Sequence, residues 1–127
     1  MSMKATAQVN SVSVSVAPLL RTATVTGTAV DLANVIENMF VFTCGANTDG
    51  TFTPKLTECA TVAGTYTDVA AADLVGTALV AMAANTVQLI SYIGKLEFIK
   101  PVVTVTGSPA TGANVVVSAV VRKRKQP

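Results

Sequence analysis

Asn114-Val115-Val116-Val117-Ser118-Ala119-Val120-Val121 is the stretch that decides the fold class, because it is apolar at nearly every position. β-Branched side chains suit a pleated strand and lose rotamer freedom in a helix, so a β-strand is predicted here. Alternation places Val115, Val117, Ala119 and Val121 on one face, and Val116, Ser118 and Val120 on the other. A strand that is apolar on both faces lies either in a crowded core or against another subunit, and both interpretations remain open.

The same composition extends along the whole chain, where Val and Thr together supply 39 of 127 residues. Residues 11–16 and 86–93 alternate with period 2, and Asn47-Thr48-Asp49-Gly50 has the composition of a tight turn. We therefore predict one all-β domain over residues 1–127, a β-sandwich of jelly-roll-like type with eight or nine short, mostly antiparallel strands.

Several segments carry more specific expectations. The dense apolar run Met39–Cys44 predicts a fully buried central strand, and residues 30–34 predict a short connector or a single helical turn. Proline cannot donate a hydrogen bond to a sheet, so Pro54 predicts an edge strand and Pro101 predicts a bulge or a crossing between sheets. Alanine-rich residues 70–74 predict one turn of helix.

The residue inventory argues against catalysis. The chain has no histidine, which excludes histidine-based triads and histidine metal sites. We interpret its carboxylates as surface or turn groups; those considered are Glu58, Asp68, Asp73 and Glu97. No glycine-rich phosphate loop or calcium loop is present in the sequence. We predict that the protein is not an enzyme and that it uses no cofactor and no metal.

The two cysteines, Cys44 and Cys59, are predicted to be free thiols of a reducing compartment, with a disulfide between paired strands as the alternative. The N-terminus alternates Val with Ser and lacks the apolar core of a signal peptide. Two uncharged stretches of 21 residues, 74–94 and 101–121, contain too many polar or helix-breaking residues for a membrane span. We expect no membrane partner.

Charge is concentrated at the C-terminus. Residues 1–121 carry five basic and seven acidic side chains, whereas the tail contains four consecutive basic residues, Arg122, Lys123, Arg124 and Lys125. The tail is predicted to be a solvated end to the apolar strand, with contact to an acidic surface as the alternative, and no specific nucleic acid is expected. Residues 1–8 and 122–127 are interpreted as flexible arms.

Four stretches together resemble small structural proteins encoded beside the major capsid gene in tailed bacteriophages. They are Asp49–Glu58, Tyr66–Val69 with Ala72–Leu74, Asn85–Gln88 with Tyr92–Gly94, and Val102–Gly107. The resemblance covers roughly Thr26 to Val121 and consists of turns and strands rather than a catalytic signature. Such proteins are head decoration (cement) proteins, β-sandwich or jelly-roll modules that bind the outer capsid and stabilise it against internal DNA pressure.

The resemblance implies a virion structural protein on the capsid surface, made in the host cytoplasm. Its implied partners are the major capsid protein and itself, as a dimer or trimer. The candidate assembly contacts are Val115, Val117, Val120, Arg122, Lys123, Arg124 and Lys125. Two alternatives remain: another phage component such as a head-fibre base, connector or tail protein, and a carbohydrate-binding sandwich module.

Overall fold

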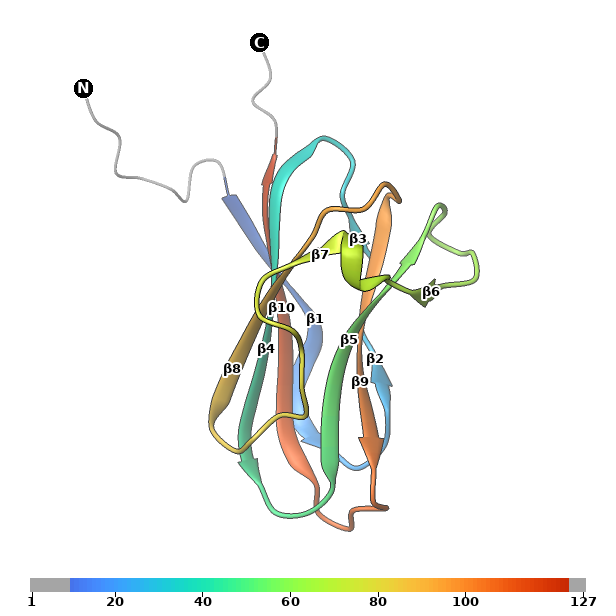
Figure 1. Ribbon diagram of the computed structural model, residues 1–127. Helices are drawn as coiled ribbons and strands as arrows, with labels where there is room; N and C mark the ends of the chain where they lie inside the picture. The colour runs from blue at the N-terminus through green and yellow to red at the C-terminus, as the bar shows by residue number, and fades with distance from the viewer. Residues whose placement is uncertain (1–9, 124–127) are drawn as a thin grey trace, which may run out of the picture.

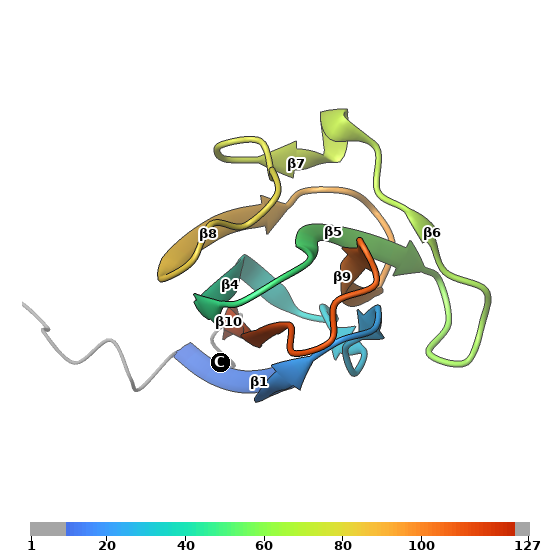
Figure 2. The same ribbon diagram turned by 90° about the horizontal axis from the view of Figure 1, so that it is seen from below.

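The computed structural model describes residues 10–123, which form two antiparallel β-sheets packed face to face (Figure 1, Figure 2). Sheet A has the order β1-β10-β4-β8-β7; sheet B has the order β2-β9-β5-β6, and β3 also pairs with β9. The elements are β1 (Asn10–Arg21), β2 (Val25–Thr26), β3 (Val30–Asp31), β4 (Val35–Asn47), β5 (Thr51–Cys59), β6 (Thr67–Asp68), the 3-10 helix η2 (Ala71–Asp73), β7 (Leu74–Val75), β8 (Thr86–Tyr92), β9 (Phe98–Thr106) and β10 (Ala113–Lys123).

The prediction of an all-β sandwich is confirmed, and so is the helical turn in residues 70–74, which the structure places at Ala71–Asp73. The described part of the chain has ten strands rather than eight or nine. The difference arises because β2, β3, β6 and β7 have only two residues each, too few for a period-2 pattern to be visible.

Strands from the first half of the chain pair with strands from the second half in reverse order. The pairs are β1 with β10, β2 and β3 with β9, β4 with β8, and β5 with β6. The chain therefore resembles one long hairpin rolled up so that alternate pairs contribute to alternate sheets. This wrapping places β10 between β1 and β4, in the middle of sheet A.

The core lies between the inner faces of the two sheets. In β4, β5, β9 and β10, alternate residues point inward, and those at the strand centres are completely or almost completely buried. Sheet A contributes Phe40, Phe42, Cys44, Val115, Val117 and Ala119, and sheet B contributes Phe52, Leu56, Ile99 and Val103. For this face of β10, the structure decides in favour of a core within a single chain.

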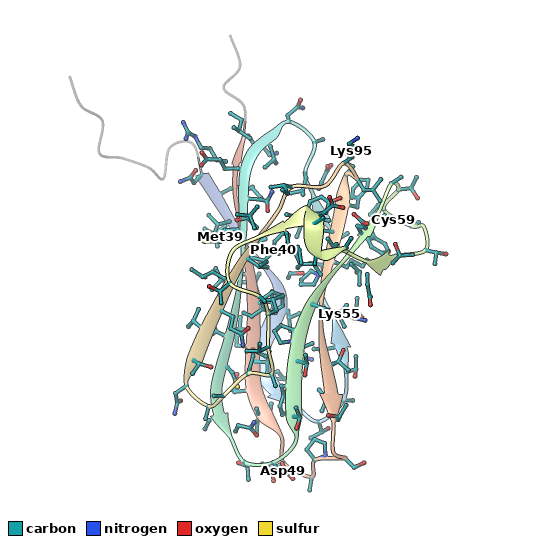
Figure 3. The ribbon with its side chains drawn as sticks, viewed as in Figure 1. Met39, Phe40, Asp49, Lys55, Cys59 and Lys95 are labelled. Carbon is teal, nitrogen blue, oxygen red and sulfur yellow. The ribbon has the colours of Figure 1, made fainter. Side chains whose placement is uncertain are left out.

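The prediction that Met39–Cys44 forms a fully buried strand is wrong for every second residue. This segment is the centre of β4 and lies between β10 and β8. Phe40 and Phe42 are 0% exposed, whereas Met39 and Val41 are only half-buried. Met39 and Phe40 leave the strand toward different sides (Figure 3). The consecutive apolar residues of this segment therefore belong alternately to the inner and the outer face of sheet A.

Residues 30–34 are a short strand followed by a turn rather than a helical turn. Val30 and Asp31 pair with Ile99 and Phe98 of β9. The Asp31 carboxylate then accepts a hydrogen bond from the Ala33 backbone N–H (2.9 Å), an arrangement that carboxylates commonly use to stabilise turns. The local pattern was too short to reveal the pairing with β9.

The two prolines of sheet B, Pro54 and Pro101, lie where a neighbouring strand is missing. Pro54 pairs with Val103 on one side, while β6 on the other side reaches only Thr57 and Glu58. Pro101 causes neither a bulge nor a crossing, because β9 continues in regular register with β5 through this residue. On its other side β9 pairs with β3 and β2 separately, and Pro101 occupies the gap between them. No ladder hydrogen bond is lost there.

The turn after β4 is a crossing between the sheets rather than a hairpin within one sheet. Gly50 has the positive φ (+89°) that the Asp-Gly pair predicted. The Asp49 carboxylate accepts hydrogen bonds from the backbone N–H groups of Ala110, Thr111 and Gly112, and these bonds lower its pKa. Asp49 thus joins the β4–β5 turn to the β9–β10 loop at one end of the sandwich (Figure 3).

Residues 76–85, between β7 and β8, connect the two sheets along one side. The Met82 backbone N–H donates to the Phe52 carbonyl of β5 (2.7 Å), and the Met82 side chain is buried. The Gln88 side chain of β8 accepts from the Val80 N–H (3.0 Å) and donates to the Val80 carbonyl (2.8 Å). The segment is therefore bonded to both layers.

Cys44 and Cys59 are free and buried, as predicted. Cys44 is on β4 of sheet A and Cys59 is on β5 of sheet B, so the alternative of a disulfide between paired strands does not apply. Burial raises the pKa of the Cys44 thiol, which keeps it protonated and unreactive.

Candidate assembly surface

The outer face of sheet A is the strongest candidate for a functional surface. The strand register aligns its outward side chains in rows that cross three or four of the strands β1, β10, β4 and β8. One row contains Val12, Val120 and Met39; the next contains Val14, Ser118, Val41 and Leu89; the third contains Val116, Thr43 and Val87. Eight of these ten side chains are apolar, and none is charged.

This face is accessible. Val12 is 66% exposed, Val14 54%, Val87 57% and Leu89 47%, while the residues of the two inner strands are half-buried among their neighbours. Figure 2 shows no described element stacked over these strands. Contiguous exposed apolar side chains of this kind are typical of protein–protein contact surfaces.

The outer face of sheet B has the opposite character. Its register rows pair Thr51 with Thr106, Thr53 with Thr104, Lys55 with Val102 and Thr57 with Lys100. Lys55 forms an ion pair with Asp68 (2.9 Å), and the Lys100 ammonium lies 4.5 Å from the centre of the Tyr66 ring. This composition is typical of a sheet face that meets water, although Thr57 and Val102 are themselves buried. The two outer faces therefore belong to the same fold but differ in what they are suited to contact.

Charged side chains lie at one end of the outer face of sheet A. Arg122 of β10 is opposite Glu37 of β4 in the register, and their nearest charged atoms are 3.7 Å apart. Lys123 follows at the end of β10 and is exposed. An apolar centre with charges at its margin is the usual anatomy of a protein interface.

The predicted contact residues separate into three groups. Val115 and Val117 are 0% exposed in the core, so the prediction that they are assembly contacts is withdrawn: these side chains already pack between the sheets. Val120, Arg122 and Lys123 lie on or beside the outer face of sheet A. Arg124, Lys125 and the arm of residues 1–8 are outside the described residues.

Sequence reasoning missed most of this surface. Val12, Val14, Met39, Val41, Val87 and Leu89 were not among the candidates. The available signal was the presence of apolar residues at both parities of β4, β8 and β10. That signal shows that each of these strands has apolar residues on its outward side as well as on its inward side. Only the register shows that the outward sides lie next to one another.

The four carboxylates considered for catalysis do not gather at one site: Glu58 and Asp73 both lie near Tyr92, whereas Asp68 and Glu97 lie elsewhere. Asp68 pairs with Lys55 on sheet B, and Glu58 accepts a hydrogen bond from the Tyr92 hydroxyl (2.6 Å). Glu97 is beside Asp31, whose side chain raises the pKa of Glu97. Over residues 10–123, no group of three or more Cys, Asp or Glu side chains is arranged to hold a metal ion.

The contact between Tyr92 and Glu58 joins the two sheets and makes stability depend on pH. Burial, together with the hydrogen bond to Glu58, raises the pKa of Tyr92 to about 12. The Leu96 N–H also donates to the Tyr92 hydroxyl oxygen (3.0 Å). A raised pKa means that the protonated hydroxyl is stabilised by folding. This contribution is complete below pH 10 and is lost as pH rises through about 12.

Tyr92→Phe is therefore expected to lower the free energy of unfolding by about 1–3 kcal/mol at pH 7–9, because Glu58 and the Leu96 N–H lose a partner. Chemical denaturation of both proteins across pH 8–12 measures the effect. The difference between them should shrink as pH approaches 12, while lysine titration affects both proteins alike. A difference that stays constant over this range would contradict the assignment.

No family model, curated protein or solved structure matches this chain. Within the described range, no helix is long and apolar enough to cross a membrane.

Proposed function

We propose that this protein is a non-enzymatic structural component of a phage virion, most specifically a decoration (cement) protein on the capsid surface. The observation that carries the proposal is the difference between the two outer faces: that of sheet A is apolar and uncharged, whereas that of sheet B is polar and charged. A solvated module has no need of the apolar face, which is suited to a protein neighbour.

The fold supports the proposal in a second way. We assign the sandwich to the jelly-roll type, because its strands pair as a rolled hairpin and alternate between two four-stranded layers, with β3 and β7 as additions. Jelly rolls occur in viral capsid and lectin domains. The near absence of aromatic side chains, 5% of the chain, argues against the lectin alternative, because sugar-binding surfaces commonly use aromatic platforms.

The mechanism is physical rather than chemical. The outer face of sheet A docks on the major capsid protein. Burying the exposed part of each Val or Leu side chain there contributes about half of the roughly 1.5–3 kcal/mol that burial of a fully exposed side chain gives. Self-association then links several such faces, so that each copy holds its neighbours at a high effective concentration. The bound array connects adjacent capsid subunits and resists their separation.

Binding to assembled capsids tests this mechanism. In the variant Val87→Glu/Leu89→Glu, two carboxylates enter the apolar face on β8, where both side chains are about half exposed and the fold is expected to tolerate them. Burial of unpaired charge is costly, so binding to purified heads in a co-sedimentation assay should fall at least ~100-fold. The matched control Thr51→Glu/Thr53→Glu adds the same charges, also two residues apart on one strand, to exposed positions on the outer face of sheet B and should bind as the parent does.

Two outcomes would overturn the proposal. One is equal loss of binding in both variants, and the other is absence of the protein from purified particles. A ring of few copies, in place of a capsid-wide array, would reassign the protein to the connector, tail or head-fibre base.

A further inference from the structure

One sheet edge differs from the other three. Across residues 10–123, β7, β2 and β6 are edge strands of two residues each, whereas the fourth edge, β1, has twelve residues. Proteins commonly protect sheet edges by keeping them short, by adding charge or proline, or by bulges. Three edges of this sandwich use the first of these devices, and β1 does not.

The second half of β1 is protected and the first half is not. The Ser15 carbonyl accepts a hydrogen bond from the Thr28 N–H (3.0 Å), and the Ser15 hydroxyl donates to the Thr28 carbonyl (2.7 Å). Register shifts lie between Val14 and Val16 and between Val16 and Leu19, and Pro18 follows within the strand. Residues 10–14, in contrast, are in unbroken register with β10 and contain no charge and no proline.

This free segment is self-complementary. Ser11-Val12-Ser13 has the same sequence in both directions, and an antiparallel strand turns the N–H and C=O of alternate residues toward its open edge. We infer that two copies of this chain associate through the free edge of β1, antiparallel about a two-fold axis at Val12. In this register Val12 faces the second copy's Val12, and Ser11 faces the second copy's Ser13.

Charge and shape agree with this arrangement. Arg122 pairs with Asn10, so the basic end of each β10 lies at one end of the shared edge. The two Asn10 positions are four residues apart along the joint, roughly 14 Å at strand spacing, which exceeds the Debye length at physiological salt. The two sheets become one, and Val12 and Val14 of both copies join their outer apolar faces into one surface.

The proposed function includes self-association of the protein, and this inference says which strand edge carries it. The inference rests on the proposed function in this point alone. Dimerisation is measured on the purified protein without capsids. A dimer that does not bind heads would refute the decoration role alone, and a monomer that binds heads would refute the edge pairing alone.

Sedimentation of charge variants tests both the edge and its register. Ser11 and Ser13 are exposed and opposite in parity to the outer-face residues Val12 and Val14. Ser11→Lys/Ser13→Lys places like charges opposite each other and should convert a dimeric parent into a monomer. Ser11→Lys/Ser13→Glu places opposite charges together and should sediment as a dimer. A monomeric parent at tens of micromolar, or a dimer that survives the first variant, would overturn the inference.

A cysteine on the two-fold axis gives a second readout. Facing residues in an antiparallel pair have Cα atoms about 4.5–5.5 Å apart, which is within the range that a disulfide spans. Val12→Cys should therefore form a covalent dimer under mild oxidation, while the buried Cys44 and Cys59 stay reduced. Leu20→Cys, equally accessible at the protected end of β1, should remain monomeric on a non-reducing gel. Equal cross-linking of both variants, or of neither, would contradict the pairing.

Discussion

Phe42→Ala is expected to lower the free energy of unfolding by about 3–5 kcal/mol and the midpoint temperature by roughly 10–20 °C. Phe42 lies on β4 at the centre of sheet A, is 0% exposed, and is opposite Val117 of β10 in the register. Its removal leaves a cavity between the two sheets. The strands of each sheet are held in place by their own ladder hydrogen bonds, so the sheets cannot collapse to fill it. Urea denaturation followed by circular dichroism measures the change.

The neighbouring residue provides the control. Val41 is adjacent in sequence and on the same strand, but it is half-buried and points to the outer face of sheet A. Val41→Ala is expected to cost less than about 1 kcal/mol, because its environment already admits water. Similar losses for the two variants would mean that the outer face is covered within the chain, and the proposed docking surface would then be wrong.

Gly112→Ala is expected to destabilise the fold by about 2–5 kcal/mol. Gly112 has φ +80°, and a Cβ there would overlap the Arg21 carbonyl oxygen at the end of β1. The Gly112 N–H also donates to the Asp49 carboxylate. A shift of the backbone away from Arg21 would therefore disturb the β1–β10 pairing and the connection to the β4–β5 turn together.

Gly45→Ala is the matched comparison. Gly45 is within β4, its φ is not in the left-handed region, and a Cβ there would meet only Asn114, at 3.5 Å or more. Alanine should leave stability unchanged or raise it by about 0.5–1 kcal/mol, because glycine loses more conformational entropy on folding. Thermal denaturation of both variants decides the matter: a mild effect at Gly112 would show that the end of the sandwich adjusts easily.

Local patterns were sufficient for the long elements. Alternation located β1 and β8, a run of β-branched residues located β10, and Asp49-Gly50 located a turn whose glycine has positive φ. They failed where pairing with a distant strand determines the structure. Val30 and Asp31 are a strand because β9 has unpaired groups beside them, and Pro101 is harmless because its neighbouring strand is interrupted at that point. No local signal contains this information.

The candidate surface shows the same division more sharply. Val120 was selected together with Val115 and Val117 because all three belong to one apolar run, but one is at the surface and two are in the core. Parity along the strand separated them correctly into two faces. Which face meets the other sheet depends on the direction in which the sandwich closes, and the run contains no information about that.

The amino-acid sequence by itself determined the class of this protein: β-branched residues at period 2, few charges and no histidine specify an all-β module without histidine chemistry. Only the tertiary structure decided which apolar residues stay outside the core. The reason is that β-pairing is non-local: the register of β1, β10, β4 and β8 assembles isolated valines and leucines into one uncharged face. Pairing likewise leaves one half of one edge free, and together these two features define the surface that we propose for assembly.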